Sequence, residues 1–176
     1  MLFTRIFTLA VIGFTAPGFL IPEGQEEGTY AVEYINGRSV HTKIANATVY
    51  APVPEPYALE PRTGRLVRRE GVSCGGAKNL DHGNTDAVNA DIDRQCGNGA
   101  QVGSGLTYYA IRGDVVAFFC NFRSGFASTC TARERQQYSG QITNACGWYN
   151  SGWYTYFNNY WSYGYDRGRC FCEQCA

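Results

Sequence analysis

Two features that would point to common classes of protein are missing from this sequence. Its most apolar stretch, residues 6–14, is nine residues long, whereas a membrane-spanning helix needs about 20. Residues 70–176 carry eight Lys and Arg against nine Asp and Glu, so they lack the positive excess expected of proteins that bind nucleic acid or anionic membranes. The sequence therefore predicts no membrane anchor and no nucleic-acid partner.

Signatures of common enzyme classes are missing as well. Residues 70–176 contain one histidine, His82, which excludes acid–base chemistry by two histidines. No GxSxG, HExxH or phosphate-binding glycine motif occurs. Asp91 and Asp93 are two apart on a predicted helix and therefore do not face each other. We predict that the chain is not an enzyme and uses no cofactor; a small hydrolase built around His82 and Asp81 is the weaker alternative.

Proline and cysteine divide the chain near residue 70. All six prolines precede this point, and no cysteine does. The eight cysteines that follow it are Cys74, Cys96, Cys120, Cys130, Cys146, Cys170, Cys172 and Cys175. An even number of cysteines in a secreted chain indicates disulfides, whose pairing the sequence leaves open. A zinc site in the C-terminal cluster would need reduced thiols outside the cell, so we predict no metal.

The first 18 residues have the composition of a secretory signal. Arg5 supplies a positive charge, residues 6–14 supply the apolar stretch, and Ala16 and Gly18 are small residues suited to cleavage. We expect residues 1–18 to be a signal peptide and the protein to be secreted and extracellular.

Residues 19–69 resemble a propeptide. Two alternating segments, residues 30–35 and 38–44, flank Asn36-Gly37, a strong signal for a β-hairpin. The sequence Asn46-Ala47-Thr48 that follows makes Asn46 a candidate for N-glycosylation.

A proline-rich segment, residues 51–61, then leads to the dibasic pair Arg68-Arg69. Kexin-type proteases cut after such pairs in exposed segments. We predict cleavage after Arg69 and a mature cysteine-rich domain of residues 70–176. An N-terminal hairpin that stays integral to the protein is the alternative.

The cysteine-rich part alternates helices and strands. Apolar side chains recur every four residues in residues 84–97, with Asn84 or Thr85 as N-cap, and again in residues 131–147, where Thr131 and Glu134 form a capping-box pattern. Residues 105–111 and 114–121 predict a hairpin around Arg112-Gly113-Asp114, which we interpret as a tight turn rather than an integrin motif. Residues 152–157 and 160–165 predict another hairpin, and residues 169–173 a last strand. This order predicts an α+β fold: a small disulfide-rich two-layer α/β sandwich, with an antiparallel sheet and two helices in a split β-α-β arrangement.

Aromatic side chains are concentrated between residues 148 and 165. Because alternate residues of a strand point to opposite faces, they cannot all enter one core. Exposed Trp and Tyr beside amides and hydroxyls suit a sugar or a protein partner. The predicted binding residues are Trp148, Trp153, Tyr156, Trp161 and Tyr163. The alternative is a sheet whose outer face is merely capped by tyrosines.

The order of cysteine motifs resembles a known family. "VSCGG", "DIDRQCGN", "VVAFFCN", "QITNACG" and "YGYDRGRCFC" follow one another as in the virally encoded killer toxin of smut fungi and related secreted fungal proteins. The resemblance covers residues 72–176. It implies an α/β sandwich and a toxin or host-directed role, the toxin itself being associated with calcium-channel block; it assigns no functional residue.

From these features we expect a secreted, disulfide-stabilised, killer-toxin-like effector or toxin. It would act as a monomer by binding a protein on the surface of a host or competitor cell. The alternative is a cell-wall carbohydrate-binding protein that uses the aromatic surface.

Overall fold

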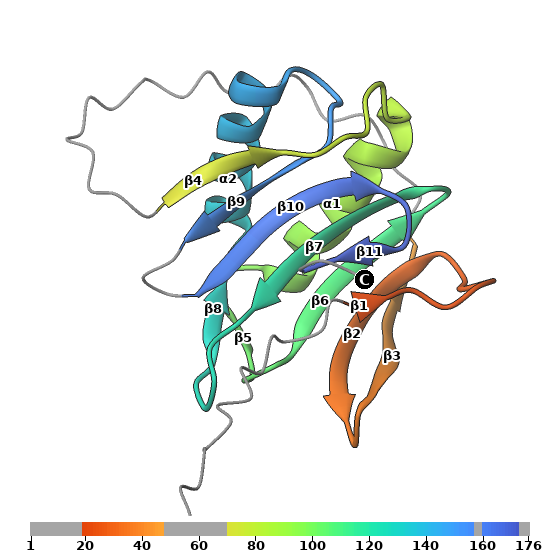
Figure 1. Ribbon diagram of the computed structural model, residues 1–176, viewed down its shortest axis with the longest axis vertical. Helices are drawn as coiled ribbons and strands as arrows, with labels where there is room; N and C mark the ends of the chain where they lie inside the picture. Colours follow the sequence, from red (N-terminus) through yellow and green to blue (C-terminus); the bar gives the residue numbers. More distant parts are fainter. Residues whose placement is uncertain (1–18, 48–69, 157–159, 173–176) are drawn as a thin grey trace, which may run out of the picture.

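A computed structural model describes residues 19–47, 70–156 and 160–172. The predicted signal peptide, the pair Arg68-Arg69 and Cys175 lie outside these ranges. The described residues build one antiparallel sheet of seven strands (Figure 1). In spatial order these are β3 (Arg38–Asn46), β2 (Gly28–Ile35), β6 (Thr107–Arg112), β7 (Val115–Asn121), β10 (Trp161–Arg167), β9 (Gly152–Tyr156) and β4 (Glu70–Cys74).

Two helices and two small ribbons complete the structure. The helices are α1 (His82–Cys96) and α2 (Ala132–Cys146). One ribbon pairs β1 (Phe19–Leu20) with β11 (Cys170–Phe171), and the other pairs β5 (Ala100–Val102) with β8 (Ser128–Cys130). The prediction of a small disulfide-rich α+β fold with an antiparallel sheet and two helices is therefore confirmed.

The sheet is buried on both faces. On β7, Val115, Ala117 and Phe119 join the apolar cluster that includes residues of both helices, whereas Val116, Phe118 and Cys120 join a second cluster on the opposite face. The helices thus cover one face (Figure 1). The second cluster is completed by residues of the N-terminal segment and of β11. This alternation is the two-residue period of a β-strand.

The N-terminal hairpin is part of this sheet. Strands β2 and β3 pair around Asn36-Gly37, as predicted from the sequence. β2 also pairs with β6, from Gly28 opposite Ile111 to Val32 opposite Thr107. The structure therefore places the predicted propeptide hairpin in the same sheet as the cysteine-rich part, and cleavage at Arg68-Arg69 stays a prediction.

The other predicted hairpins are also found. Strands β6 and β7 pair antiparallel around Gly113, whose positive φ of 55° suits a tight turn, and β9 pairs with β10. The last strand is shorter than predicted and pairs with β1 instead of joining the main sheet.

Both helices begin at a side-chain cap. Helix α1 starts earlier than predicted, because the Asp81 carboxylate accepts a hydrogen bond from Asn84 N at 2.8 Å; Asn84 and Thr85 are therefore inside the helix and not its cap. Helix α2 begins as predicted, with Thr131 Oγ1 accepting from Glu134 N at 3.1 Å.

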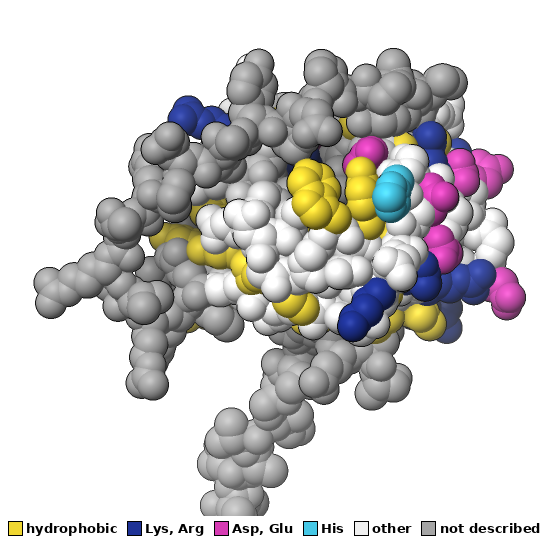
Figure 2. Space-filling view, turned by 90° about the horizontal axis from the view of Figure 1, so that it is seen from above, with side chains coloured by type: hydrophobic (Ala, Val, Ile, Leu, Met, Phe, Trp, Pro, Cys, Tyr) yellow, Lys and Arg dark blue, Asp and Glu magenta, His cyan; other side chains and the backbone are white. Residues whose placement is uncertain are grey.

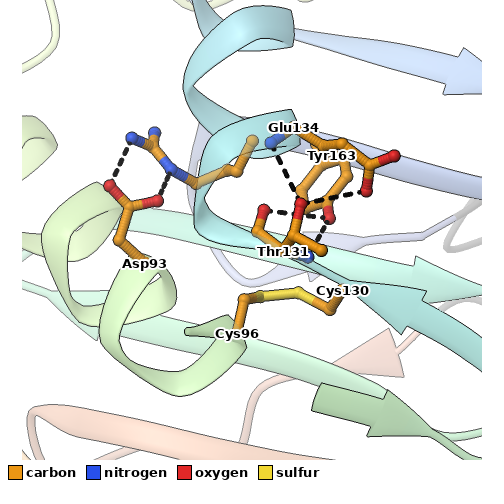
Figure 3. The surroundings of a disulfide bond; sticks show 7 residues. Asp93, Cys96, Cys130, Thr131, Glu134 and Tyr163 are labelled. Atoms are coloured by element: carbon orange, nitrogen blue, oxygen red, sulfur yellow. Dashed lines mark hydrogen bonds and ion pairs between the residues drawn. A yellow bond between two sulfur atoms is a disulfide. The ribbon is translucent and has the colours of Figure 1, made fainter. Parts of the chain in front are cut away.

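Three disulfides connect the layers. Cys74–Cys146 joins β4 to α2, Cys96–Cys130 joins α1 to β8, and Cys120–Cys172 joins β7 to the residue after β11. Figure 3 shows Cys96–Cys130 beside the start of α2. Cys170 is disulfide-bonded as well. Each disulfide contributes about 2–4 kcal/mol to the free energy of unfolding. This contribution matters because a small domain buries a limited part of its surface on folding.

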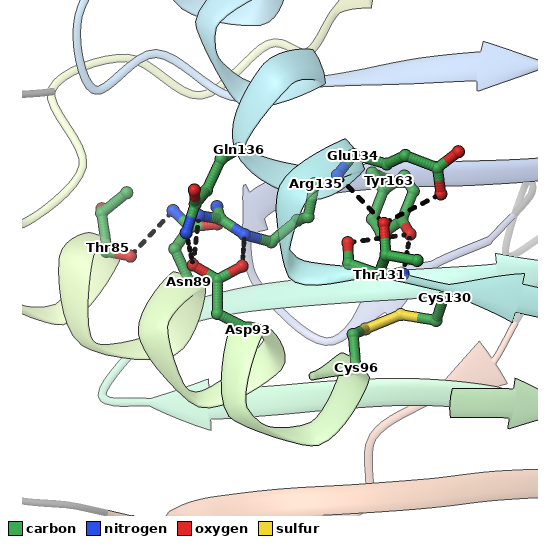
Figure 4. Close-up of polar contacts among 10 residues, drawn as sticks. All are labelled: Thr85, Asn89, Asp93, Cys96, Cys130, Thr131, Glu134, Arg135, Gln136 and Tyr163. Atoms are coloured by element: carbon green, nitrogen blue, oxygen red, sulfur yellow. Dashed lines mark hydrogen bonds and ion pairs between the residues drawn. A yellow bond between two sulfur atoms is a disulfide. The ribbon is translucent and has the colours of Figure 1, made fainter. Parts of the chain in front are cut away.

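A buried arginine joins the two helices. Arg135 of α2 forms a bidentate ion pair with Asp93 of α1, and its Nη1 donates to Asn89 Oδ1 at 2.9 Å (Figure 4). Gln136 Nε2 also donates to Asp93, at 2.9 Å. Because the arginine has several partners, the cost of burying its charge is offset by directed hydrogen bonds.

We predict that Arg135→Ala lowers the free energy of unfolding by about 3 kcal/mol, because the half-buried Asp93 carboxylate would lose its positively charged partner and keep only the hydrogen bond from Gln136. Arg133→Ala on the exposed side of the same helix is the matched control and should change it by less than about 0.5 kcal/mol. Urea unfolding followed by tryptophan fluorescence measures both. Equal losses in the two variants would contradict the role given to the ion pair.

Candidate functional site

An exposed group of side chains lies where α1 begins. It comprises Trp148, Tyr149, His82 and Asp86 and is called the Trp148–His82 patch below. Trp148 and His82 are exposed, whereas Tyr149 and Asp86 are half-buried. Figure 2, which views the molecule from this end, shows hydrophobic side chains against a histidine, with acidic side chains close by.

The rings of the patch are in contact. The Tyr149 ring stacks on the His82 imidazole, with centroids 3.6 Å apart and planes 10° from parallel. The ring centroids of Trp148 and Tyr149 are 6.2 Å apart, and the Trp148 residue is 64 % exposed. The Tyr149 hydroxyl donates to Asp86 Oδ2 at 3.3 Å. The exposed Trp148 indole thus lies next to the stacked rings of Tyr149 and His82, and the Asp86 carboxylate lies at the edge of this group.

Two loops hold the patch in place. Residues 75–80 and 149–151 are joined by three backbone hydrogen bonds: Leu80 N to Tyr149 O, Ser151 N to Ala77 O, and Gly75 N to Ser151 O, each 2.8–2.9 Å long. The Cys74–Cys146 disulfide closes the start of this pair of loops. Gly75 must be a glycine, because a Cβ there would collide with the buried Ser151 side chain. The patch is therefore built on a fixed support.

The backbone at Tyr149 is in an uncommon conformation. Its φ is +53°, a left-handed value that costs free energy for a bulky residue. Stacking on His82 and the hydrogen bonds of the Tyr149 hydroxyl and carbonyl hold it there. Tyr160 and Cys172 have similar φ values, so the contacts of Tyr149, and not its φ, distinguish the patch.

The carboxylate of the patch is partly desolvated. Burial raises the pKa of Asp86, while the hydrogen bond from Tyr149 and the charge of His82 act in the opposite direction. The patch can therefore offer the apolar face of the exposed Trp148 indole and a nearby carboxylate acceptor to a ligand. In the ranges that the structure describes, no three His, Cys, Asp or Glu side chains are grouped so as to hold a metal ion.

The five predicted binding aromatics do not form one surface. Only Trp148 is strongly exposed. Trp153 and Tyr156 are half-buried and belong to opposite faces of the sheet. The prediction is wrong for Trp161 and Tyr163 as surface residues, because they are 4 % and 1 % exposed.

Packing and a hydrogen bond explain the burial of these two residues. Trp161 stacks on Tyr156 with centroids 5.0 Å apart. The Tyr163 hydroxyl accepts from Thr131 N at 2.9 Å, so this phenol supports the start of α2 (Figures 3 and 4). Burial raises the pKa of Tyr163 well above its usual range. The β10 aromatics on this face are therefore core residues.

The acidic residues considered for catalysis have other partners. Asp81 caps α1, Asp91 is buried and pairs with Arg94, and Asp93 pairs with Arg135. His82 is in contact with Tyr149 instead. Asn46, the predicted glycosylation site, is exposed at the end of β3.

Comparison with protein-family models, curated proteins and solved structures finds no match. Among the described residues, no helix has both the length and the apolar character needed to cross a membrane.

Sequence reasoning missed Tyr149 and Asp86. His82 and Asp86 are four residues apart, which places them on one side of a helix. The sequence prediction started this helix at Asn84 or Thr85, so it left His82 outside the helix. The contact of Tyr149 with both depends on the pairing of the two loops, for which the sequence contains no signal.

We predict that Tyr149→Phe raises the pKa of Asp86 further, because the ring stays stacked on His82 while the hydrogen bond to the carboxylate is lost. The pH dependence of the Asp86 carboxyl carbon shift measures this. Tyr160→Phe, at an exposed position before β10, is the control and should leave that titration unchanged. A pKa that stays the same or falls in Tyr149→Phe would show that the hydrogen bond does not act on Asp86.

Proposed function

We propose that this chain is a secreted, disulfide-stabilised effector or toxin of the killer-toxin-like kind, which binds a target on another organism's cells through the Trp148–His82 patch. The observation that carries the proposal is the exposed Trp148 indole beside the Tyr149–His82 stack. Large exposed aromatic residues on a rigid support are typical of binding hot spots, because little entropy is lost when they are covered.

The two-layer α/β sandwich that the resemblance to the smut-fungus killer toxin implies is part of the same proposal. A two-layer sandwich of the split β-α-β kind has helices on one face of an antiparallel sheet, and both helices here lie on one face. The β1–β11 ribbon on the other face would be an addition to that arrangement.

The secreted location is proposed from the cysteines and the N-terminal sequence. Three disulfides among the described residues suit an oxidising compartment. Residues 1–18 would supply the signal.

The test is binding of the labelled, purified protein to living cells of candidate hosts and competing fungi, together with growth inhibition or cell death. We expect Trp148→Ala to weaken binding by about tenfold or more and to reduce the biological effect in parallel. Phe126→Ala removes another strongly exposed ring, on the loop before β8, and should change binding by less than about twofold. Equal binding of wild type and Trp148→Ala would overturn the proposal.

A cell-wall glycan is the second candidate target. The half-buried carboxylate of Asp86 beside exposed aromatic rings favours it, because sugar rings present an apolar face and hydroxyl donors together. Retention of the protein on chitin or β-glucan, lost in Trp148→Ala and kept in Phe126→Ala, would identify this target. Cell binding without retention on either polymer would identify a protein.

Binding without catalysis is also part of the proposal, and two substitutions of His82 test it. His82→Phe keeps a flat ring for Tyr149 to stack on but cannot transfer a proton, so we expect it to retain most activity, whereas His82→Ala should lose part of it. If both variants abolish activity while both still bind cells, the hydrolase alternative is correct.

A further inference from the structure

Strand β6 is covered by the N-terminal segment. β2 pairs with it over five residues, from Gly28 opposite Ile111 to Val32 opposite Thr107. Without β2, the cysteine-rich part would end at β6, and the backbone N–H and C=O groups on that side would have no strand partner. An open edge of this kind accepts an added strand.

The apolar face beside β6 is covered by the same segment. Val32 is fully buried, and the Tyr30 ring stacks on Tyr109 of β6 at 5.1 Å. Phe19 lies against Phe171 of β11, with centroids 6.1 Å apart. The buried residues that the N-terminal segment adds to this cluster are Phe19, Ile21, Tyr30 and Val32. Their removal would expose a contiguous aromatic surface on β6, β7 and β11, and such surfaces mark interaction sites.

No disulfide ties this segment to the rest. The first cysteine of the chain is Cys74, and the three bonds among described residues all join positions after it. After a cut within residues 48–69, residues 19–47 would be held without a covalent bond, by strand pairing, apolar contacts and a few polar contacts such as Gly113 N to Glu27 Oε1 at 3.0 Å.

We propose that the edge of β6 and the apolar face beside it are a strand-binding interface. Residues 19–47 are its occupant and remain bound as a separate chain once segment 48–69 is cut. The inference is independent of the proposed function, since it involves no residue of the Trp148–His82 patch.

The sequence of residues 19–47 suits this interface. Tyr30 and Val32 supply large apolar side chains two residues apart. Gly28 is the very small residue that the pairing of β2 with β3 requires, because a Cβ there would meet the Ala45 carbonyl oxygen at 2.6 Å.

His41 makes the interface sensitive to pH. Its Nδ1 lies 2.8 Å from the Tyr109 hydroxyl, and its Nε2 is buried without a hydrogen-bond partner in the described structure. The groups facing it are Tyr109 of β6, Tyr30 of β2, Lys43 of β3, and the carboxylates Glu23 and Glu26 before β2. Lys43 is paired with Glu26 at 2.8 Å. Burial lowers the pKa of His41.

The sign of the pH effect follows from that direction. A histidine whose pKa is lowered in the bound state binds its proton more readily once released. Its contribution to binding is therefore complete above about pH 6.5 and is lost as the pH falls from there toward the lowered pKa. Acid should loosen the segment.

The experiment uses the full chain with a site for a sequence-specific protease inserted in segment 48–69. After cutting, we expect the two fragments to elute together from gel filtration at pH 7.5 and to separate in urea. A fluorescent synthetic peptide of residues 19–47 should then exchange into the complex, severalfold faster at pH 5 than at pH 7.5. His41→Gln, which keeps a polar side chain but does not titrate, should remove this difference.

Two matched substitutions in the peptide test the contacts. Val32→Ala, at a fully buried position, should weaken its binding by about tenfold. Val40→Ala, at a position 40 % exposed on the neighbouring strand, should weaken it by less than about twofold. Immediate separation of the fragments at pH 7.5, or equal effects of the two substitutions, would overturn the proposal. If the larger fragment pairs with a second copy of itself and excludes the peptide, the interface joins copies of this chain and residues 19–47 are not its proper occupant.

Discussion

A strand buried on both faces is the constraint on which this fold depends. All seven residues of β7 are buried, with alternate side chains in two separate apolar clusters. Each face must therefore be covered, because the aromatic residues of neighbouring strands cannot be left in water without a large loss of stability. The helices cover one face, and among the described residues the N-terminal segment and β11 cover the other. The position of β2 follows from this need.

The helices and the N-terminal segment, which cover the two faces of the sheet, are attached to it by different interactions. On the helical face, Cys74–Cys146 and Cys96–Cys130 attach each helix to a strand, and Arg135 ties the helices to each other. On the opposite face, Cys120–Cys172 fixes the chain after β11, but β1, β2 and β3 are held without covalent bonds. The helical side, which carries the Trp148–His82 patch, is thus rigid, whereas the other side has a cover that can separate.

Local signals in the sequence predicted the helices, strands and turns well, but they did not predict which of these elements pack against one another. The Asn36-Gly37 turn, the Thr131 cap and the hairpin around Gly113 depend on a few adjacent residues, and the structure contains all three. The pairing of β2 with β6 joins residues about 80 positions apart, and no local pattern encodes it.

The candidate site was predicted only in part for the same reason. Trp148 is exposed, but Trp161 and Tyr163 belong to the core because α2 packs over them, and Tyr149 meets His82 through a pair of loops.

The β1–β11 ribbon has a topological consequence. Phe19 is paired with Phe171, so the first and last described strands of the chain are neighbours. Chains whose ends lie together tolerate circular permutation. A link from the segment after β11 to residue 19, combined with an opening in segment 48–69, would preserve every strand pairing and disulfide described above. In the permuted chain the cysteine-rich part would be synthesised first, and the N-terminal segment that covers β6 would be synthesised last.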